Sequence, residues 1–217
     1  MASEPPQWFS GAFSPPRLKP YLDLMQGDSV TALHLYRWNI EVSEAFYGPL
    51  HCLEIGLRNA EHDQLCLRYG RADWWRVAPL RADHAKRIHK AFDDARNSTR
   101  VPTADDLVAE LSFGFWVSLL TRAYDRHLWV PTLHRAFPYY TGSRERLRDG
   151  LQSMVLFRNR IMHHEPIHHR HLAADHTKIY RLLGYLQPGI VMWLREFDRV
   201  PEILARRPRQ VTGDEHP

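Results

Sequence analysis

Apolar and aromatic residues recur at helical spacing from about residue 29 to residue 69, and the same spacing returns in segments further along the chain. Residues three and four positions apart share one face of a helix, so this spacing gathers the apolar side chains on one side. The apolar and polar alternation of a half-buried strand is not convincing anywhere in the chain. The pattern therefore predicts an all-α protein.

The first long segment is interrupted by Gly48-Pro49. A proline inside a helix removes a backbone donor and its ring clashes with the preceding turn. We therefore expect two helices, at about 29–47 and 49–69, which meet at a kink. Gly70 closes the second helix, because glycine readily takes the left-handed conformation that ends helices.

The residues before this segment show a weaker pattern. Residues 1–16 look like an arm and residues 17–26 like a short helix, after which Gly27-Asp28-Ser29 supplies a stop and a new cap. We therefore divide the chain into three parts: an arm with a short helix (1–27), a helical domain (28–205) and a polar tail (206–217).

Two helices are predicted in the middle of the chain. Residues 81–96 form a charged amphipathic pattern, and the side chains expected to point inward are Ile88, Ala91, Phe92 and Ala95. Thr103, with acidic residues in the next turn, opens a helix through about Thr121. Its packing centre should be Phe113-Gly114-Phe115-Trp116.

The last third of the chain predicts further helices. Ser143 caps a helix from Arg144 to about Met162. Two or three helices fill residues 172–205, with a break at Pro188-Gly189.

Composition agrees with a folded domain that has a mild basic bias. The chain has 217 residues, of which 44% are hydrophobic, and 29 Lys and Arg exceed 25 Asp and Glu to give a formal charge of +4. This charge is compatible with a polyanionic partner but does not identify one. The two cysteines, Cys52 and Cys66, form no CxxC motif, as expected in a reducing compartment.

Nothing in the sequence predicts contact with a membrane. No apolar run approaches the roughly twenty residues that span a bilayer. The start of the chain lacks the basic and apolar regions of a signal peptide. We therefore expect a cytoplasmic protein without a membrane partner.

Candidate chemistry is concentrated at the end of the helix predicted over 144–162. Its apolar stripe runs through Leu147, Leu151, Met154 and Val155, and the next position on that stripe is Arg158. Burying an unpaired charge costs several kcal/mol, so Arg158 requires a carboxylate partner, a subunit interface or a wet cleft. An ion pair inside the bundle and a phosphate-binding arginine are both compatible with this position.

His163 follows Arg158 by five residues, which places the two side chains about 140° apart on a straight helix. They can converge if the helix frays, which Pro166 favours just beyond His163, or if a second subunit supplies one of them. Asn159 lies four residues before His163 and could orient its ring. The alternative for His163 is a histidine that only caps the helix.

A second pair of charges, Glu54 and Arg58, intrudes among leucines and isoleucine in the segment 50–60. They could form a local pair four residues apart, which stabilises the helix. Alternatively, Glu54 could meet Arg158 or His163 across the bundle and fix its geometry. We favour a supporting role over direct chemistry for both residues.

His164-Glu165-Pro166-Ile167-His168 matches the zinc-protease pattern HExxH. That pattern binds zinc only when both histidines project from one continuous helical face, and Pro166 opposes this. We expect no metal and no cofactor, and we keep a histidine-rich, metal-dependent hydrolase as a third hypothesis.

Four segments carry a resemblance to a known family: Trp38-Asn39 with Ser43-Glu44-Ala45, Leu53 to Asn59, Leu111 to Trp116, and Arg158-Asn159 to His163-His164. With these segments in order, the chain resembles the Abi-like (abortive infection) proteins, a branch of the HEPN superfamily, over most of residues 28–200. Arg158 to His163 looks like the Rx4-6H signature of that family. The chain differs from many relatives at Met162, where they carry a small residue, and at Glu165-Pro166.

The resemblance implies an all-α, HEPN-like helical bundle with additional N- and C-terminal helices. It also implies a homodimer and metal-independent endoribonuclease activity in a toxin–antitoxin or phage-defence setting, with RNA as substrate and an antitoxin protein as a further partner. In the implied mechanism His163 transfers protons while the RNA 2′-hydroxyl attacks phosphorus, and Arg158 stabilises the phosphoryl oxygens. The implied supporting residues are Asn159, His164, Glu54 and Arg58. The alternative is a catalytically silent HEPN module that dimerises or binds RNA without cutting it.

Overall fold

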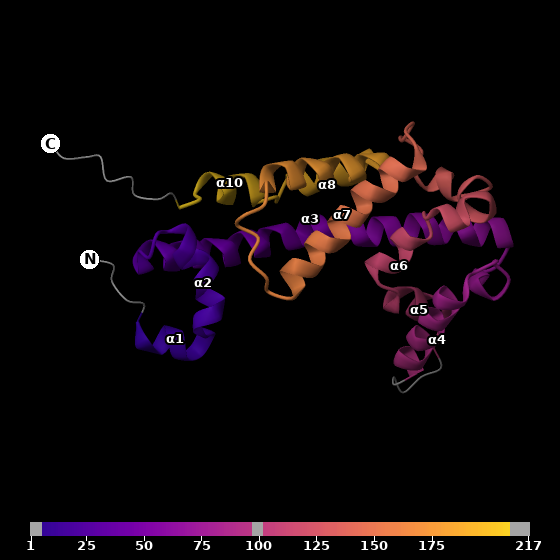
Figure 1. Ribbon diagram of the computed structural model, residues 1–217. Helices are drawn as coiled ribbons and strands as arrows, with labels where there is room; N and C mark the ends of the chain where they lie inside the picture. Colours follow the sequence, from indigo (N-terminus) through magenta and orange to yellow (C-terminus); the bar gives the residue numbers. More distant parts are fainter. Residues whose placement is uncertain (1–5, 97–101, 209–217) are drawn as a thin grey trace.

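The computed structural model describes residues 6–96 and 102–208. Figure 1 shows an all-α arrangement in which one long helix, α3 (Ser29–Tyr69), runs through the molecule and the other helices pack against it. The described residues contain no strand, so the prediction of an all-α protein is confirmed.

The helix α3 is continuous over 41 residues, and the prediction of two helices kinked at Gly48-Pro49 is wrong. Pro49 is buried inside the helix, and buried side chains line the same face before and after it, from Leu35 to Leu65. This packing offsets the hydrogen bond that the proline removes. The helix begins at Asp28, whose side chain accepts from Val30 N, and ends at Gly70 with φ 67°.

The N-terminal region is more ordered than an arm. It forms α1 (Gln7–Phe13) and α2 (Pro15–Leu24). Phe9 is buried and its ring lies 5.5 Å from that of Tyr36 on α3. The prediction of an arm over 1–16 is therefore wrong for the described residues, because these aromatic side chains bury themselves against α3.

After a 3₁₀ turn (Trp74–Arg76), α4 (Ala82–Arg96) follows the predicted bounds closely. Ile88 and Ala91 are buried as predicted, but Phe92 is exposed, and the buried side chain of His84 joins the inward face. The amphipathic pattern thus identified the helix but misassigned Phe92.

The helix predicted from Thr103 to about Thr121 is two helices, α5 (Ala104–Glu110) and α6 (Phe113–Ser118). Thr103 caps α5 as predicted. The chain is extended at Leu111 and Ser112, and the Ser112 side chain caps α6 by accepting from Phe115 N. Leu111 and the aromatic residues of α6 are buried, so the break serves core packing.

The connection to the next helix consists of the short turns η2 (Arg122–Tyr124), η3 (Asp125–Trp129) and η4 (Leu133–Ala136). The helix α7 (Arg144–Met162) has the predicted bounds. Three helices fill the C-terminal region as predicted: α8 (Leu172–Leu186), α9 (Pro188–Arg195) and α10 (Val200–Ala205).

The helices α7 and α8 pack on α3 and on each other, and α6 packs on α7. These contacts bring the segments of the candidate site together around the middle of α3 (Figure 1). Within the described ranges, no helix is long and apolar enough to cross a membrane. Of the predicted polar tail, residues 209–217 lie outside the described residues.

Candidate functional site

The end of α7 carries the candidate catalytic residues, and its geometry follows from local sequence. The helix stays regular to Met162, and His163 is its C-terminal cap. His163 N donates to Asn159 O (2.9 Å) and Glu165 N donates to Arg160 O (2.8 Å). His164 takes the left-handed conformation (φ 56°) that such a helix end requires. The predicted end of the helix is therefore confirmed.

Arg158 meets Glu54 across the bundle. Its Nε donates to Glu54 Oε2 at 3.1 Å, and the side chains of Arg158 and Glu54 are 35% and 20% exposed. Of the alternatives given for Glu54, the one in which it meets Arg158 or His163 across the bundle is therefore confirmed, with Arg158 as the partner, 104 positions away in the chain. The other carboxylate oxygen, Oε1, accepts from Phe113 N at 3.2 Å. That N–H belongs to the first turn of α6, where it has no partner inside the helix.

One carboxylate thus joins three of the four segments on which the family resemblance rests. Glu54 lies between a guanidinium group and the N-terminus of α6, so both of its oxygens face positive charge or a donor. The sequence did not predict the contact with Phe113, because the donor is a backbone N–H, which every residue except proline carries. Only Ser112, a typical N-cap residue, signalled that a helix starts there.

Arg158 keeps part of its hydrogen-bonding capacity. Glu54 occupies Nε, and neither terminal nitrogen of Arg158 bonds to another group in the described part of the chain. With the side chain about one-third exposed, these nitrogens can receive an anion from solvent. The geometry therefore accommodates both roles considered for Arg158, an ion pair inside the bundle and the binding of a phosphate.

Arg58 does not pair with Glu54, so the alternative of a local pair four residues apart is wrong. Its Nε bonds to the side-chain oxygen of the adjacent Asn59 at 3.3 Å. The Glu54 carboxylate instead faces α7 and α6, where it accepts one hydrogen bond from each helix. Arg58 is half-buried and lies one turn from Glu54 on α3.

His163, His164 and Asn159 are exposed. Their side chains form no hydrogen bond or ion pair within the described ranges, although the carbonyl of His164 accepts from Arg17 Nη1 at 2.7 Å. Because α7 stays regular to Met162, Arg158 and His163 point about 140° apart within one chain. The idea that fraying reunites them is therefore wrong, and a second subunit remains as the route to a shared site.

The HExxH segment is not a zinc-binding helix. His164 is in the left-handed region and exposed, while His168 is buried in a turn against Tyr21, with ring centroids 4.8 Å apart. Neither ring nitrogen of His168 has a hydrogen-bond partner in the described structure, and burial lowers the pKa of His168 to about 4. Among the described residues, no group of three or more His, Cys, Asp and Glu side chains could hold a metal ion.

Asn39 fixes the loop that follows α7. Its buried Oδ1 accepts from Ile167 N (2.9 Å) and from His168 N (3.1 Å). The neighbouring Trp38 donates its Nε1 to Ile203 O at 2.8 Å. Trp38-Asn39 thus holds the α7 end and α10 against α3, a structural role that the sequence did not reveal.

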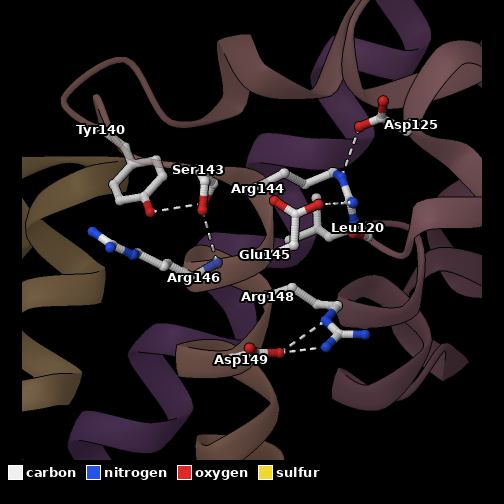
Figure 2. Close-up of polar contacts among 9 residues, drawn as sticks. All are labelled: Leu120, Asp125, Tyr140, Ser143, Arg144, Glu145, Arg146, Arg148 and Asp149. Carbon is white, nitrogen blue, oxygen red and sulfur yellow. Dashed lines mark hydrogen bonds and ion pairs between the residues drawn. The ribbon is translucent and has the colours of Figure 1, made fainter.

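Sequence reasoning missed several buried charged residues, and one of them, Arg144, lies at the other end of α7 (Figure 2). Its Nε donates to Asp125 Oδ1 at 2.7 Å, and its terminal nitrogens donate to Leu120 O and to Glu145. Arg144 lies three residues before Leu147 on the same stripe as Arg158, and this spacing could have identified it. All three of its nitrogens are engaged, so it is a structural arginine.

One further cluster has the residue types of a hydrolase triad, but its hydrogen bonds do not run in the direction that such a triad requires. His84 Nε2 lies 2.7 Å from Ser118 Oγ, and Asp83 lies beside His84 Nδ1. The Ser118 hydroxyl, however, donates to Phe115 O at 2.5 Å, so His84 is the donor to Ser118 and not its base. Burial lowers the pKa of His84, and the hydrogen bond between His84 and Ser118 links α4 to α6.

Comparison of the chain with protein-family models, with curated proteins and with solved structures finds no match in any of the three.

Proposed function

We propose that the protein is a metal-independent endoribonuclease of a toxin–antitoxin or phage-defence system. It cleaves RNA through attack of the 2′-hydroxyl on the adjacent phosphorus, which leaves 2′,3′-cyclic phosphate and 5′-hydroxyl ends. The observation that carries this proposal is the bridge at Glu54, which holds Arg158 by one nitrogen while the other two have no partner among the described residues.

Arg158 supplies the positive charge of the proposed reaction. Its terminal nitrogens form a planar, positively charged fork that matches two phosphate oxygens. Glu54 compensates part of this charge and restricts the side chain, so the fork is positioned before substrate arrives. Glu54 is therefore a positioning residue.

His163 supplies proton transfer. It is exposed at the helix end and unbonded to other described side chains, so it can approach a substrate hydroxyl. Histidine both accepts and returns a proton near neutral pH, as 2′-hydroxyl attack requires. Asn159 and His164 lie beside it and are exposed, where they can assist in binding phosphate.

The regular helix separates Arg158 from His163, so we propose that the site is composite. In a symmetric homodimer, Arg158 of one copy faces His163 of the other, which forms two equivalent sites. This arrangement also explains why the side chain of the proposed catalytic histidine has no hydrogen-bond partner among the described residues of its own chain.

The test is cleavage of single-stranded RNA in excess EDTA by purified protein. We expect cleavage by the wild type, mapped by ends that carry 2′,3′-cyclic phosphate, and none by the double variant Arg158→Ala, His163→Ala. Arg148→Ala is the matched control, because Arg148 lies on the same helix, is similarly exposed and bonds only to Asp149. Equal activity in the wild type and the double variant would refute the proposal.

A catalytically silent module is the second candidate, and the Glu54–Arg158 pair itself favours it. Such a pair is what a structural role for Arg158 requires. Retention of RNA on the wild type without new 5′-hydroxyl ends would support this function in place of cleavage.

The proposed biological setting has its own test. Expression of the wild type should arrest growth of the host cell, and His163→Ala should relieve the arrest. Arrest by both forms would separate toxicity from the proposed chemistry.

A further inference from the structure

A cavity of about 550 Å³ opens beside the end of α7, between α2, α3 and the residues that flank His163. Met162 and His164 form one wall. The N-terminal helices line another part of it, through Phe13 of α1 and Arg17 and Tyr21 of α2. Its volume is in the range of sites that enclose a small organic ligand.

Aromatic rings line much of this cavity. Tyr36 lies between two of them, with ring centroids 5.0 Å from Tyr21 and 5.7 Å from Phe13. Tyr47, which is 53% exposed, stands further along α3 at the same cavity. Such rings bind flat aromatic ligands by stacking on their faces or against their edges.

Two nearly buried polar side chains also line the cavity and keep unused hydrogen-bonding groups. Asn39 is 6% exposed, and its Oδ1 is fixed by two backbone donors of the following loop. This orientation leaves Nδ2 as a donor with no partner in the described residues. Tyr21 is 2% exposed, and its hydroxyl likewise has no such partner. Neither of these two donor atoms is completely buried, so each can donate a hydrogen bond to a ligand in the cavity.

The charged residues at the cavity favour a phosphate beside Arg17 and not beside Glu44. Within the described residues, Arg17 bonds only to His164 O, through Nη1, and its Nε and Nη2 have no partner there. The acidic residue of the cavity, Glu44, has a side chain that is 66% exposed and faces Arg199 at 3.4 Å. An anion beside Arg17 is therefore favoured over one beside Glu44.

We propose that this cavity binds one nucleotide of an RNA strand. The base stacks among the tyrosines and accepts hydrogen bonds from Tyr21 and Asn39, and its phosphate meets Arg17. The inference rests on the proposed function for its choice of RNA, since a strand seated between Met162 and His164 passes His163. A free mononucleotide has the same chemistry, and the experiment separates the two sources.

The experiment measures binding apart from cleavage. An eight-residue 2′-O-methyl RNA lacks the attacking hydroxyl, so the chain cannot cut it, and calorimetry gives its affinity for the full-length protein. Tyr21→Phe removes one hydroxyl and keeps the ring, and Arg17→Gln removes the charge. We expect each to weaken binding about tenfold.

Matched controls lie outside the cavity. Tyr139→Phe and Arg37→Gln make the same chemical changes at exposed positions, and they should change affinity less than about twofold. Ser43→Phe adds bulk at the cavity wall and should abolish binding by filling the space. Thermal unfolding of every variant identifies any that fail to fold, and the remaining variants decide the outcome.

Equal affinities across the folded variants, or no binding by the wild type, would overturn the proposal. A mononucleotide that binds as tightly as the oligomer without displacing it would overturn the assignment to RNA. A dimer that Ser43→Phe dissociates, in protein that binds no nucleotide, would instead assign the cavity to a second copy of the chain and overturn the proposal. Binding that depends on the cavity in a wild type that cuts no RNA would refute the proposed cleavage and support the cavity.

Discussion

The two ends of α7 each place an arginine on the same stripe, and the structure uses them in opposite ways. Arg144, at the start of the helix, is 6% exposed, and all three of its nitrogens donate to other groups (Figure 2). Arg158, near the end, is about one-third exposed, and in the part of the chain that the structure describes it donates through Nε alone. Arg144 links α7 to the preceding turns, whereas Arg158 is held by Glu54 and its two terminal nitrogens have no partner in the described residues.

This difference separates an arginine that is fully engaged in the fold from one that keeps nitrogens able to bind a ligand. A fully engaged arginine contributes to stability and cannot bind substrate without losing partners. A partly engaged one contributes little to stability, because its pair is hydrated. Its free nitrogens are therefore available for a ligand, and substitutions at the two ends should have separable effects.

The largest effect we predict is at Arg158. Arg158→Ala should lower RNA cleavage by about 100- to 1000-fold, as expected when a preorganised donor to a charged transition state is removed. The free energy of unfolding should change by less than about 1 kcal/mol, because the Glu54 pair is partly exposed. Single-turnover cleavage and urea unfolding measure the two quantities. A large loss of stability with unchanged cleavage would make Arg158 another structural arginine.

The opposite result is expected at Arg144. Arg144→Leu should destabilise the protein by about 3 kcal/mol, because the buried Leu120 carbonyl loses its donor and α7 loses its contact with Asp125. Cleavage per folded molecule should stay within about twofold. Urea unfolding followed by tryptophan fluorescence checks the first expectation. A neutral effect on stability would remove the contrast between the two ends.

Acidification should weaken the C-terminal end through His168. Burial lowers the pKa of His168 to about 4 from its ordinary value of 6.5, so the unfolded chain binds a proton more readily than the folded one. The free energy of unfolding should therefore be at its full value above pH 6.5 and should fall by about 3 kcal/mol as the pH drops toward 4.

The control for this prediction is His168→Leu, which cannot titrate and removes two buried ring nitrogens that lack partners. Urea unfolding at several pH values gives the difference between the wild type and the variant. The difference should grow in favour of the variant below pH 6.5. If the difference in unfolding free energy stays constant over this range, His168 is not a neutral imidazole buried in the folded protein.

The smallest effect concerns Glu54. Glu54→Gln keeps an acceptor for Phe113 N but removes the charge that positions Arg158, so kcat should fall about tenfold with little change in KM. Glu145→Gln is the counterpart at the other end of α7, where the carboxylate pairs with Arg144. It should leave kcat unchanged. Equal loss in both variants would indicate a general effect of charge.

The bounds of α7 could be predicted because both of its ends are encoded locally. Ser143 caps the start, and Pro166 forces an end shortly after Met162. The contact between Glu54 and Arg158 could also be anticipated, since a charge on an apolar stripe requires a partner and Glu54 was an intruding carboxylate.

Other features depend on tertiary packing and could not be read from local signals. Pro49 normally breaks a helix, but burial along the whole of α3 overrides that preference. Residues 7–13 lack a strong helical pattern, and they fold because Phe9 and Phe13 find Tyr36 on α3. The cavity depends on these same contacts, so it could not be predicted once that segment had been assigned to an arm.

The most direct measurement of the proposed site mixes two inactive variants, Arg158→Ala and His163→Ala, after unfolding and joint refolding. In a composite dimer, each mixed dimer retains one intact site, and a 1:1 mixture should recover about one quarter of wild-type cleavage in EDTA, because half of the dimers are mixed and each has one of two sites. Differently labelled subunits verify that mixed dimers form. If mixed dimers form and the mixture cuts no more RNA than either variant alone, Arg158 and His163 do not share a site across two copies.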